Sequence, residues 1–316
     1  MLCKDIADRI LPEWKTPLSQ THSSIDCYCP PIEFFTDLID KKIPFGFCKL
    51  NHVFWETVSE KHDLESLREL MENELTRPLF GVQAGGSSLG WLLLHGFDLL
   101  EETLALIKSL NGSSVMFGAS HLGPPDESLF VGHVSYERRL ECIKASLPDG
   151  YIPLFGSLWK KYALDGSMPQ LFEAIRDRRV VVVGLNHLAH INKYTEFSDF
   201  RHIEVTLDAT KRRIELLDMF LHEWRPNDFW IFQAGETLSM WFICQMSKTN
   251  GQFLDVGRSL DMFMPSENLK LDSQTLSIIP DFYEQYWMQN RRDDFRSCER
   301  GGTTIPLGIL RQKMEK

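Results

Sequence analysis

The sequence lacks several features that define common classes of protein. No apolar run approaches the ~20 residues that a membrane-spanning helix needs. The first residues, Met-Leu-Cys-Lys-Asp, contain no apolar stretch of the signal-peptide kind. The seven cysteines are an odd number and are scattered along the chain, so we interpret them as reduced thiols. We therefore expect a cytoplasmic protein with no membrane span.

Positive charge is scarce as well. Lys and Arg number 34 against 44 Asp and Glu, which gives a net charge of −10. A general electrostatic nucleic-acid binder is disfavoured, because phosphate backbones attract a surplus of positive charge. The sequence also contains neither G-x-x-x-x-G-K-[ST] nor G-x-G-x-x-G. Walker-type nucleotide hydrolysis and Rossmann dinucleotide binding therefore both lose support.

What is present is the composition of a chain with a sizeable packed core. Apolar residues make up 43%, charged residues 25% and aromatic residues 11%, which excludes a disordered or collagen-like protein. From residue 43 onward, short apolar runs alternate with longer amphipathic segments. The run 179–185, RVVVVGL, predicts a strand that is buried on both faces. The expected strands are 45–50, 79–83, 114–119, 151–155, 179–185, 202–207, 228–233 and 252–256.

Helical patterns lie between these strands, at 57–75, 88–110, 135–147, 210–224 and 238–247. In the segment 210–224, Ile214, Leu217, Leu221 and Trp224 are spaced as one apolar stripe. Strand–helix alternation of this kind predicts an α/β fold with a mostly parallel, Rossmann-like sheet covered by helices. We expect one α/β domain at 43–280, preceded by an N-terminal extension or cap at 1–42, where prolines break helices. We also expect a C-terminal tail at 281–316 that packs on the domain.

Polar, small and histidine residues follow several of the expected strands. In parallel sheets, ligands bind at the carboxyl ends of the strands, so these residues predict a nucleotide or phosphate site, although loops are polar in any protein. The residues are Asn51, His52, Gly85, Gly86, Ser87, Ser88, Ser120, His121, Asn186, His187, His190, Gly235, Glu236, Thr237, Asp255, Gly257, Arg258 and Asp261.

The turn 233–237, QAGET, leads directly into an expected helix. Gly235 allows a positive φ or a close approach of a ligand to the backbone. Thr237 is expected to cap the helix, whose free N–H groups suit a diphosphate. Glu236 is the carboxylate best placed for general-base work. The same segment would also serve as a capped turn without a ligand, and the glycine-rich turn with Gly85, Gly86 and Ser87 is open to both interpretations.

Two cations and two histidines are expected at the same edge. Lys49 or Arg258 would neutralise a diphosphate, although Arg258 could instead pair with Asp255 or Asp261. Asp255 lies in an apolar strand, where an unpaired charge is costly, so it needs a partner or a function. His187 and His190 lie three residues apart and would share one face of a helical loop. We interpret them as substrate or phosphate contacts, or as structural hydrogen-bonding groups.

The segment 179–261 contains strand VVVVG, a loop with His190, strand IEVTL, an amphipathic helix, FWIFQAGETLSMWF and then FLDVGRSLD. This order resembles the bacterial and phage nucleotide-sugar glycosyltransferases of the GT-D fold. In that family a strand leads through a Gly-x-Thr turn into a buried helix. The next strand has an Asp-x-Gly-x-x-x-Asp-like ending. The matching residues here are Gly235, Thr237, Asp255, Gly257 and Asp261.

The resemblance implies a glycosyltransferase. Such an enzyme moves a sugar from a nucleotide-diphospho-sugar to an acceptor hydroxyl on a glycan or glycoprotein. Lys49, Arg258 and the helix start at 235–237 would stabilise the leaving diphosphate. Glu236, Asp255 or His190 would accept the proton of the acceptor.

One segment departs from the family pattern. The family carries Arg-x-Gly-Asp-Gly-Glu after its first strand, and the acidic pair binds a divalent metal. Residues 49–54 here read KLNHVF, so Lys49 keeps the cation but both acids are missing. We therefore expect the nucleotide-sugar as co-substrate and no metal cofactor. The diphosphate would be held by Lys49, His52 and Arg258.

Two alternatives to this function stay open. The first is a phage DNA glycosyltransferase that acts on a hydroxymethylated base in the host cytoplasm, with the Arg-rich segment 291–300 as its basic-aromatic patch. The second is a non-catalytic module that binds a nucleotide-sugar. A homo-oligomer is compatible with either.

Overall fold

One β-sheet organises the chain. The structure, a computed structural model, describes residues 3–17, 26–50, 98–110, 112–119, 147, 151, 154–156, 158–206, 209–257 and 259–263. Within these residues, nine strands form one sheet in the order β1-β2-β5-β4-β3-β9-β8-β6-β7. Every neighbouring pair is parallel except β1 and β2. The predicted α/β fold with a mostly parallel sheet is confirmed.

The strand bounds agree with the expected ones at most positions. The strands are β1 (Lys15–Pro17), β2 (Asp26–Tyr28), β3 (Phe45–Leu50), β4 (Val115–Ala119), β5 (Leu154–Phe155), β6 (Arg179–Gly184), β7 (Asp199–Glu204), β8 (Phe229–Gln233) and β9 (Gln252–Asp255). Two strands differ from the expectation. Strand β5 begins at Leu154, three residues after the expected start at 151, and β7 begins three residues before the expected 202–207. Strand β7 lies at the edge of the sheet, where polar residues are tolerated, so the apolar residues after it did not mark its position. The expected strand at 79–83 and the helix at 57–75 lie outside the described residues.

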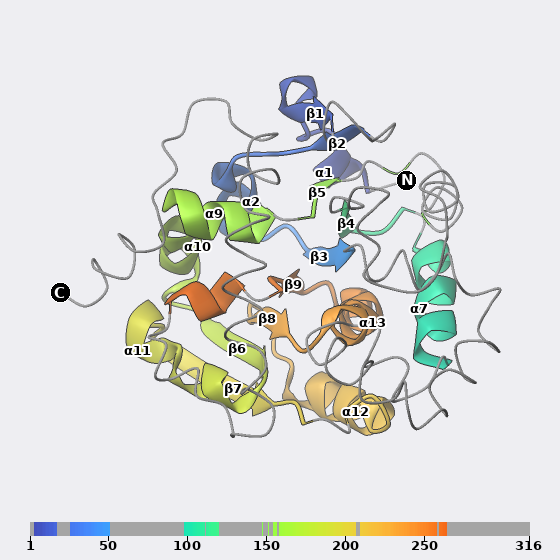
Figure 1. The fold of residues 1–316 in the computed structure, drawn as a ribbon, viewed down its shortest axis with the longest axis vertical. Helices are drawn as coiled ribbons and strands as arrows, with labels where there is room; N and C mark the ends of the chain where they lie inside the picture. Colours follow the sequence, from blue (N-terminus) through green and yellow to red (C-terminus); the bar gives the residue numbers. More distant parts are fainter. Residues whose placement is uncertain are drawn as a thin grey trace, which may run out of the picture.

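Helices cover both faces of the sheet (Figure 1). On one face lie α2 (Ile32–Asp40), α9 (Leu158–Asp165) and α10 (Met168–Ile175), whose apolar residues share one core cluster. On the other face lie α7 (Asp98–Ser109), α12 (Arg213–Glu223) and α13 (Glu236–Met246), which share a second cluster. The shorter elements are α1 (Lys4–Ala7), η1 (Pro12–Trp14), η3 (Asn186–His190), α11 (Asn192–Thr195), η4 (Ser247–Thr249) and η5 (Ser259–Phe263).

Strand β6 joins these two clusters. Val180 and Val182 point into the cluster with α2, α9 and α10, whereas Val181 and Val183 point into the cluster with α12 and α13. All four side chains are fully buried, because successive residues of a strand face opposite sides of a sheet that is covered on both. This is the reason that a continuous run of valine, without alternation, predicted the strand correctly.

The predicted stripe on α12 is only partly correct. Leu217 and Trp224 pack against the second cluster as expected, but the other two residues of the stripe do not. Ile214 is 56% exposed and Leu221 is 42% exposed, whereas Leu216 and Phe220 are buried. The Phe220 ring lies 5.6 Å from the Trp230 ring of β8 and 4.7 Å from the Phe242 ring of α13, between ring centroids. The helix has apolar residues on two sides, so spacing alone could not indicate which side faces the sheet.

Residues before 43 pack on the same sheet. Helix α2, which the prolines obscured in the sequence, places Phe35 against the Trp159 ring of α9 at 4.7 Å between centroids. Tyr162 donates a hydrogen bond from its hydroxyl to the Pro30 carbonyl at 2.6 Å. The expected cap at 1–42 thus contributes α1, α2, β1 and β2, and the tail at 281–316 lies outside the described residues.

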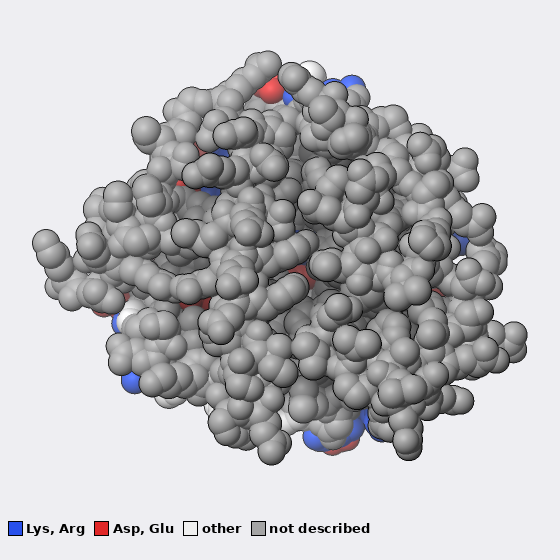
Figure 2. Space-filling view, in the orientation of Figure 1, with Lys and Arg blue, Asp and Glu red and all other residues white. Residues whose placement is uncertain are grey.

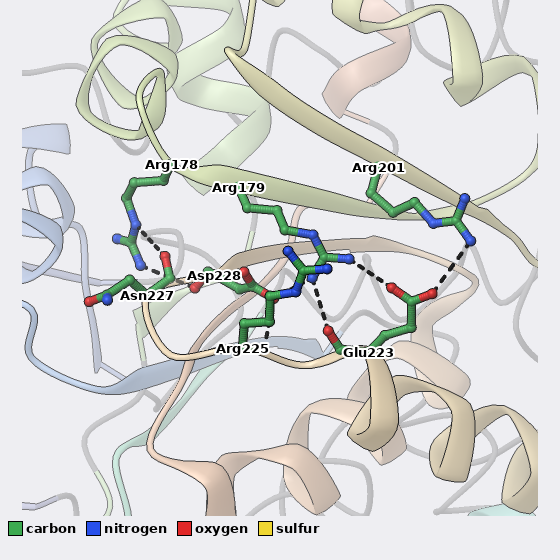
Figure 3. Close-up of polar contacts among 7 residues, drawn as sticks. All are labelled: Arg178, Arg179, Arg201, Glu223, Arg225, Asn227 and Asp228. Atoms are coloured by element: carbon green, nitrogen blue, oxygen red, sulfur yellow. Dashed lines mark hydrogen bonds and ion pairs between the residues drawn. The ribbon is translucent and has the colours of Figure 1, made fainter.

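An arginine-rich network closes the amino edge of the sheet (Figure 3). Arg179 at the start of β6 pairs with Asp228 at 2.8 Å and with Glu223 at 2.7 Å. The Asp228 side chain is only 2% exposed, and its oxygen also accepts the Arg225 amide at 2.9 Å. Burial raises the pKa of Asp228, and its contacts with the Arg225 amide and Arg179 oppose that rise.

Arg178 extends this network along the same edge. Its guanidinium donates to the backbone carbonyls of Asn227 at 2.8 Å and Asp228 at 3.1 Å, and to the side-chain oxygen of Gln252. The loop before β8 is therefore fixed to the starts of β6 and β9. Because the guanidinium groups of Arg178 and Arg179 bond the loop before β8 and the end of α12, we assign the amino edge a structural role.

Charges of both signs share the surface that is visible over α12. In Figure 2, Lys and Arg atoms lie beside Asp and Glu atoms at the lower edge, where Figure 1 shows this helix. Arg212 and Glu215 form an ion pair at 2.8 Å there. Arg213 pairs with Glu102 of α7 at 2.5 Å. This part of the surface therefore does not gather charge of one sign.

Candidate functional site

The candidate site lies at the carboxyl edge of the sheet, opposite the arginine network. Among the predicted site residues, the structure describes Lys49, His190, Gly235, Thr237 and Asp255 with their side chains, and the backbone of Glu236. Five others lie outside the described residues and stay predictions: His52, Gly85, Gly86, Ser87 and Arg258.

The chain leaves β6 and β8 in opposite directions. After β6 it enters η3, whose Leu188 belongs to the cluster with α2, α9 and α10, and it continues to β7 on the outer side. After β8 it enters α13, which belongs to the other cluster, and it continues to β9 on the inner side. Gly184 and Gln233, the last residues of β6 and β8, are register partners. Such a switch point is where ligands bind in open α/β sheets.

Helix α13 begins at this switch point. Gly235 is its N-cap residue, with φ +87° and ψ 146°, a conformation that essentially only glycine adopts. A Cβ atom added to Gly235 would meet no atom of a described residue within 4 Å, so the described part of the chain leaves space beside this backbone. The first intrahelical bond runs from the Ser239 amide to the Gly235 carbonyl at 2.8 Å. The amides of the first turn therefore have no partner within the helix, which suits an anion.

Thr237 does not cap the helix as predicted. The helix begins two residues earlier than expected, at Glu236, so Gly235 takes the cap position and no side chain bonds the first turn. Thr237 is 3% exposed, and its hydroxyl is buried without a hydrogen-bond partner among the described residues. A buried hydroxyl in that state costs about 1–3 kcal/mol. A threonine hydroxyl can both donate and accept a hydrogen bond, so Thr237 is a candidate ligand contact.

Asp255 and Lys49 meet at the ends of β9 and β3. The buried Asp255 carboxylate accepts the Gly257 amide at 2.9 Å and the Lys49 amide at 3.3 Å. Burial raises the pKa of Asp255 to about 7, although both amides and the Lys49 charge oppose that rise. A Cβ atom on Gly257 would lie 3.4 Å from the Lys49 Nζ, so the lysine side chain lies over this glycine. Asp255 therefore fixes the loop beneath Lys49.

The sequence placed His187 and Asp261 at this edge but did not predict that they contact each other and Gln233. The Asp261 carboxylate oxygen Oδ1 lies 2.9 Å from His187 Nε2 and accepts a hydrogen bond from Gln233 Nε2 at 2.6 Å. The three residues come from η5, η3 and the end of β8, so the contact ties three connections together at the switch point. Gln233 gave a signal that could have been used, because an amide at the end of an apolar strand needs a partner.

The two predicted histidines lie in different environments. His187 is buried, whereas His190 at the end of η3 is exposed. The loop is helical, as expected, and the interpretation of both histidines as substrate or phosphate contacts stays a prediction. His190 lies outside the group formed by His187, Gln233 and Asp261.

Two general findings complete the description of this site. Within the described ranges, no group of three or more His, Cys, Asp and Glu side chains is arranged to hold a metal ion. No helix in the same ranges is both long and apolar enough to cross a membrane.

Comparison of the chain with protein-family models, with curated proteins and with solved structures finds no match.

Proposed function

We propose that this protein is a glycosyltransferase that binds a nucleotide-diphospho-sugar at the carboxyl edge of its sheet and transfers the sugar to a hydroxyl of a glycan or glycoprotein. The observation that carries the proposal is the start of α13. At the switch point of the sheet, the first-turn amides of this helix have no partner within the helix, and the Thr237 hydroxyl has none among the described residues. Amides and hydroxyls donate hydrogen bonds, and a diphosphate only accepts them.

The proposed chemistry needs charge stabilisation on the leaving group. The acceptor oxygen forms a bond to the anomeric carbon, and its proton passes to Glu236, Asp255 or His190 as general base. The bond between the anomeric carbon and the diphosphate oxygen breaks, and the diphosphate departs with the electron pair. The amides of α13 and the Thr237 hydroxyl would stabilise the developing charge without rearrangement. Lys49 would add a full positive charge from β3, and Asp255 holds the Lys49 backbone and the Gly257 turn in place.

The proposal is tested by donor binding and by donor turnover. In a thermal-shift panel of UDP-glucose, UDP-N-acetylglucosamine, GDP-mannose and dTDP-glucose, at least one donor is expected to raise the melting temperature by mass action. Release of nucleoside diphosphate from that donor, with water as the default acceptor, separates an enzyme from a binding module. A panel without any shift would contradict the proposal.

A further inference from the structure

The His187–Asp261–Gln233 contact fixes the hydrogen positions of its members. An ionised carboxylate only accepts hydrogen bonds. Gln233 must therefore direct its NH2 group at Asp261, and its carbonyl oxygen Oε1 points away from that carboxylate. His187 must carry its proton on Nε2, so in the neutral ring Nδ1 is a bare acceptor.

Both of these acceptors are left without a partner. His187 Nδ1 and Gln233 Oε1 are buried and accept no hydrogen bond from any described residue. Both residues are at least nine-tenths buried. The Ser259 hydroxyl, two residues before Asp261 in η5, is also buried and has no partner among the described residues. Two such acceptors on side chains that contact one carboxylate are unusual, because buried polar atoms nearly always have partners.

The chemistry of these atoms selects the kind of ligand. Two acceptors beside a carboxylate repel phosphate oxygens, which also accept, so this group does not suit the diphosphate. A ligand that donates from neighbouring hydroxyls would satisfy both acceptors. Sugar and ribose rings carry such hydroxyls.

We propose that His187, Gln233 and Asp261 form a hydroxyl-binding subsite, in which His187 Nδ1 and Gln233 Oε1 accept hydrogen bonds from a sugar or ribose ring. The inference rests on the proposed function, since it places the ring of the nucleotide-sugar next to the α13 start. The switch point then has two chemically distinct halves: donors at α13 for the diphosphate and acceptors at η3 and β8 for the hydroxyls.

The test uses His187→Lys, which keeps an N–H donor for Asp261 and has no acceptor in place of Nδ1. His222→Lys is the matched control, because His222 is exposed on α12. The dissociation constant of the strongest binder in the donor panel is expected to rise about tenfold for His187→Lys, as for loss of one neutral hydrogen bond, and to stay unchanged for the control. If His187→Lys does not fold, Gln233→Met removes the second acceptor instead.

The same titration with the free nucleoside diphosphate identifies the ring. A loss that persists with the diphosphate assigns the subsite to ribose, and a loss seen only with the intact donor assigns it to the transferred sugar. Donor affinity that is equal in wild type and variant would overturn the subsite and leave the proposed function standing. A wild-type protein that binds no member of the panel would overturn both.

A second test measures the histidine nitrogen resonances of the wild-type protein by NMR. It requires neither a variant that binds the donor nor donor turnover. In wild-type protein with [15N]histidine at alkaline pH, the neutral His187 ring is expected to be protonated on Nε2 and bare on Nδ1, and the Nδ1 resonance is expected to move when the donor is added. His187→Lys identifies the signal. A ring protonated on Nδ1, or an Nδ1 signal unmoved by a donor that binds, would refute the subsite.

Discussion

Replacing Thr237 by valine separates a binding role of this residue from a structural one. Valine has nearly the same shape as threonine but has no hydroxyl. In the folded protein the Thr237 hydroxyl is buried and has no partner among the described residues. If it belongs to a diphosphate site, Thr237→Val should affect the free protein and the donor complex in opposite directions.

The expected magnitudes follow from the two states. In the free protein, the variant removes an unsatisfied hydroxyl, whose burial costs about 1–3 kcal/mol. The free energy of unfolding should therefore rise by about 1 kcal/mol, which corresponds to a melting temperature higher by about 2 °C. In the complex, the variant loses a hydrogen bond to a charged group, worth about 1.5–3 kcal/mol. The dissociation constant of the donor should rise about ten- to a hundredfold.

Thr103→Val provides the matched control. Thr103 is fully buried in α7, and its hydroxyl donates to the Leu99 carbonyl at 2.6 Å. This variant loses a bond that the free protein makes, so its stability should fall by about 1 kcal/mol while donor affinity holds. Denaturant unfolding and calorimetric titration measure both quantities on each protein. A Thr237→Val protein that is more stable yet binds the donor as wild type does would show that the hydroxyl has no ligand.

The remaining predictions concern pH, stability and metal. Asp255 has a pKa near 7 when folded and near 4 when unfolded, so the folded state binds its proton more tightly and stability falls as pH rises through that window. Relative to Asp255→Asn, wild type should lose on the order of 4 kcal/mol between pH 4 and 7, and parallel pH–stability curves would contradict this. Asp228→Ala breaks the buried pair with Arg179 and should lower the free energy of unfolding by about 3 kcal/mol. Glu215→Ala breaks the exposed pair with Arg212 and should lower it by less than about 1 kcal/mol. Equal losses of stability in urea unfolding would refute the structural role of the amino edge. Donor turnover should survive chelation, because residues 49–54 lack the acidic pair that would hold a hard cation, and complete loss in EDTA that manganese restores would show otherwise.

The arrangement of the sheet could be predicted because its signals are local. A run such as Val180–Val183 fits only a strand that is buried on both faces, and the segments between the strands repeat at helical spacing. The orientation of α12 and the existence of α2 depended on information that local patterns do not contain. Whether Ile214 or Leu216 faces the sheet is decided by packing against α13 and β8. Prolines at 30 and 31 come just before α2 and set its start without interrupting it.

The candidate site was predictable only in its location. Gly235, Thr237, Asp255 and Lys49 were predicted from their positions at the ends of strands, since the carboxyl ends of parallel strands meet at one edge of the sheet. The contact between His187, Gln233 and Asp261 joins residues 28 to 74 positions apart, and no spacing rule connects them. The cap of α13 was placed two residues too late, because Thr and Gly are about equally favoured at the N-cap and the local sequence does not choose between Gly235 and Thr237. That error concealed the unpartnered hydroxyl.

The central claim is that a nucleotide-sugar binds where α13 begins. The most direct test is an amide NMR titration of the 15N-labelled protein with the donor selected by thermal shift. We predict that the largest changes fall on the amides of Gly235, Glu236, Thr237 and Leu238. The chemical shifts of the Asn227 and Asp228 amides, at the opposite edge of the sheet, should not change. Changes centred on the amino edge, or an unaltered α13 start in the presence of a bound donor, would contradict the account.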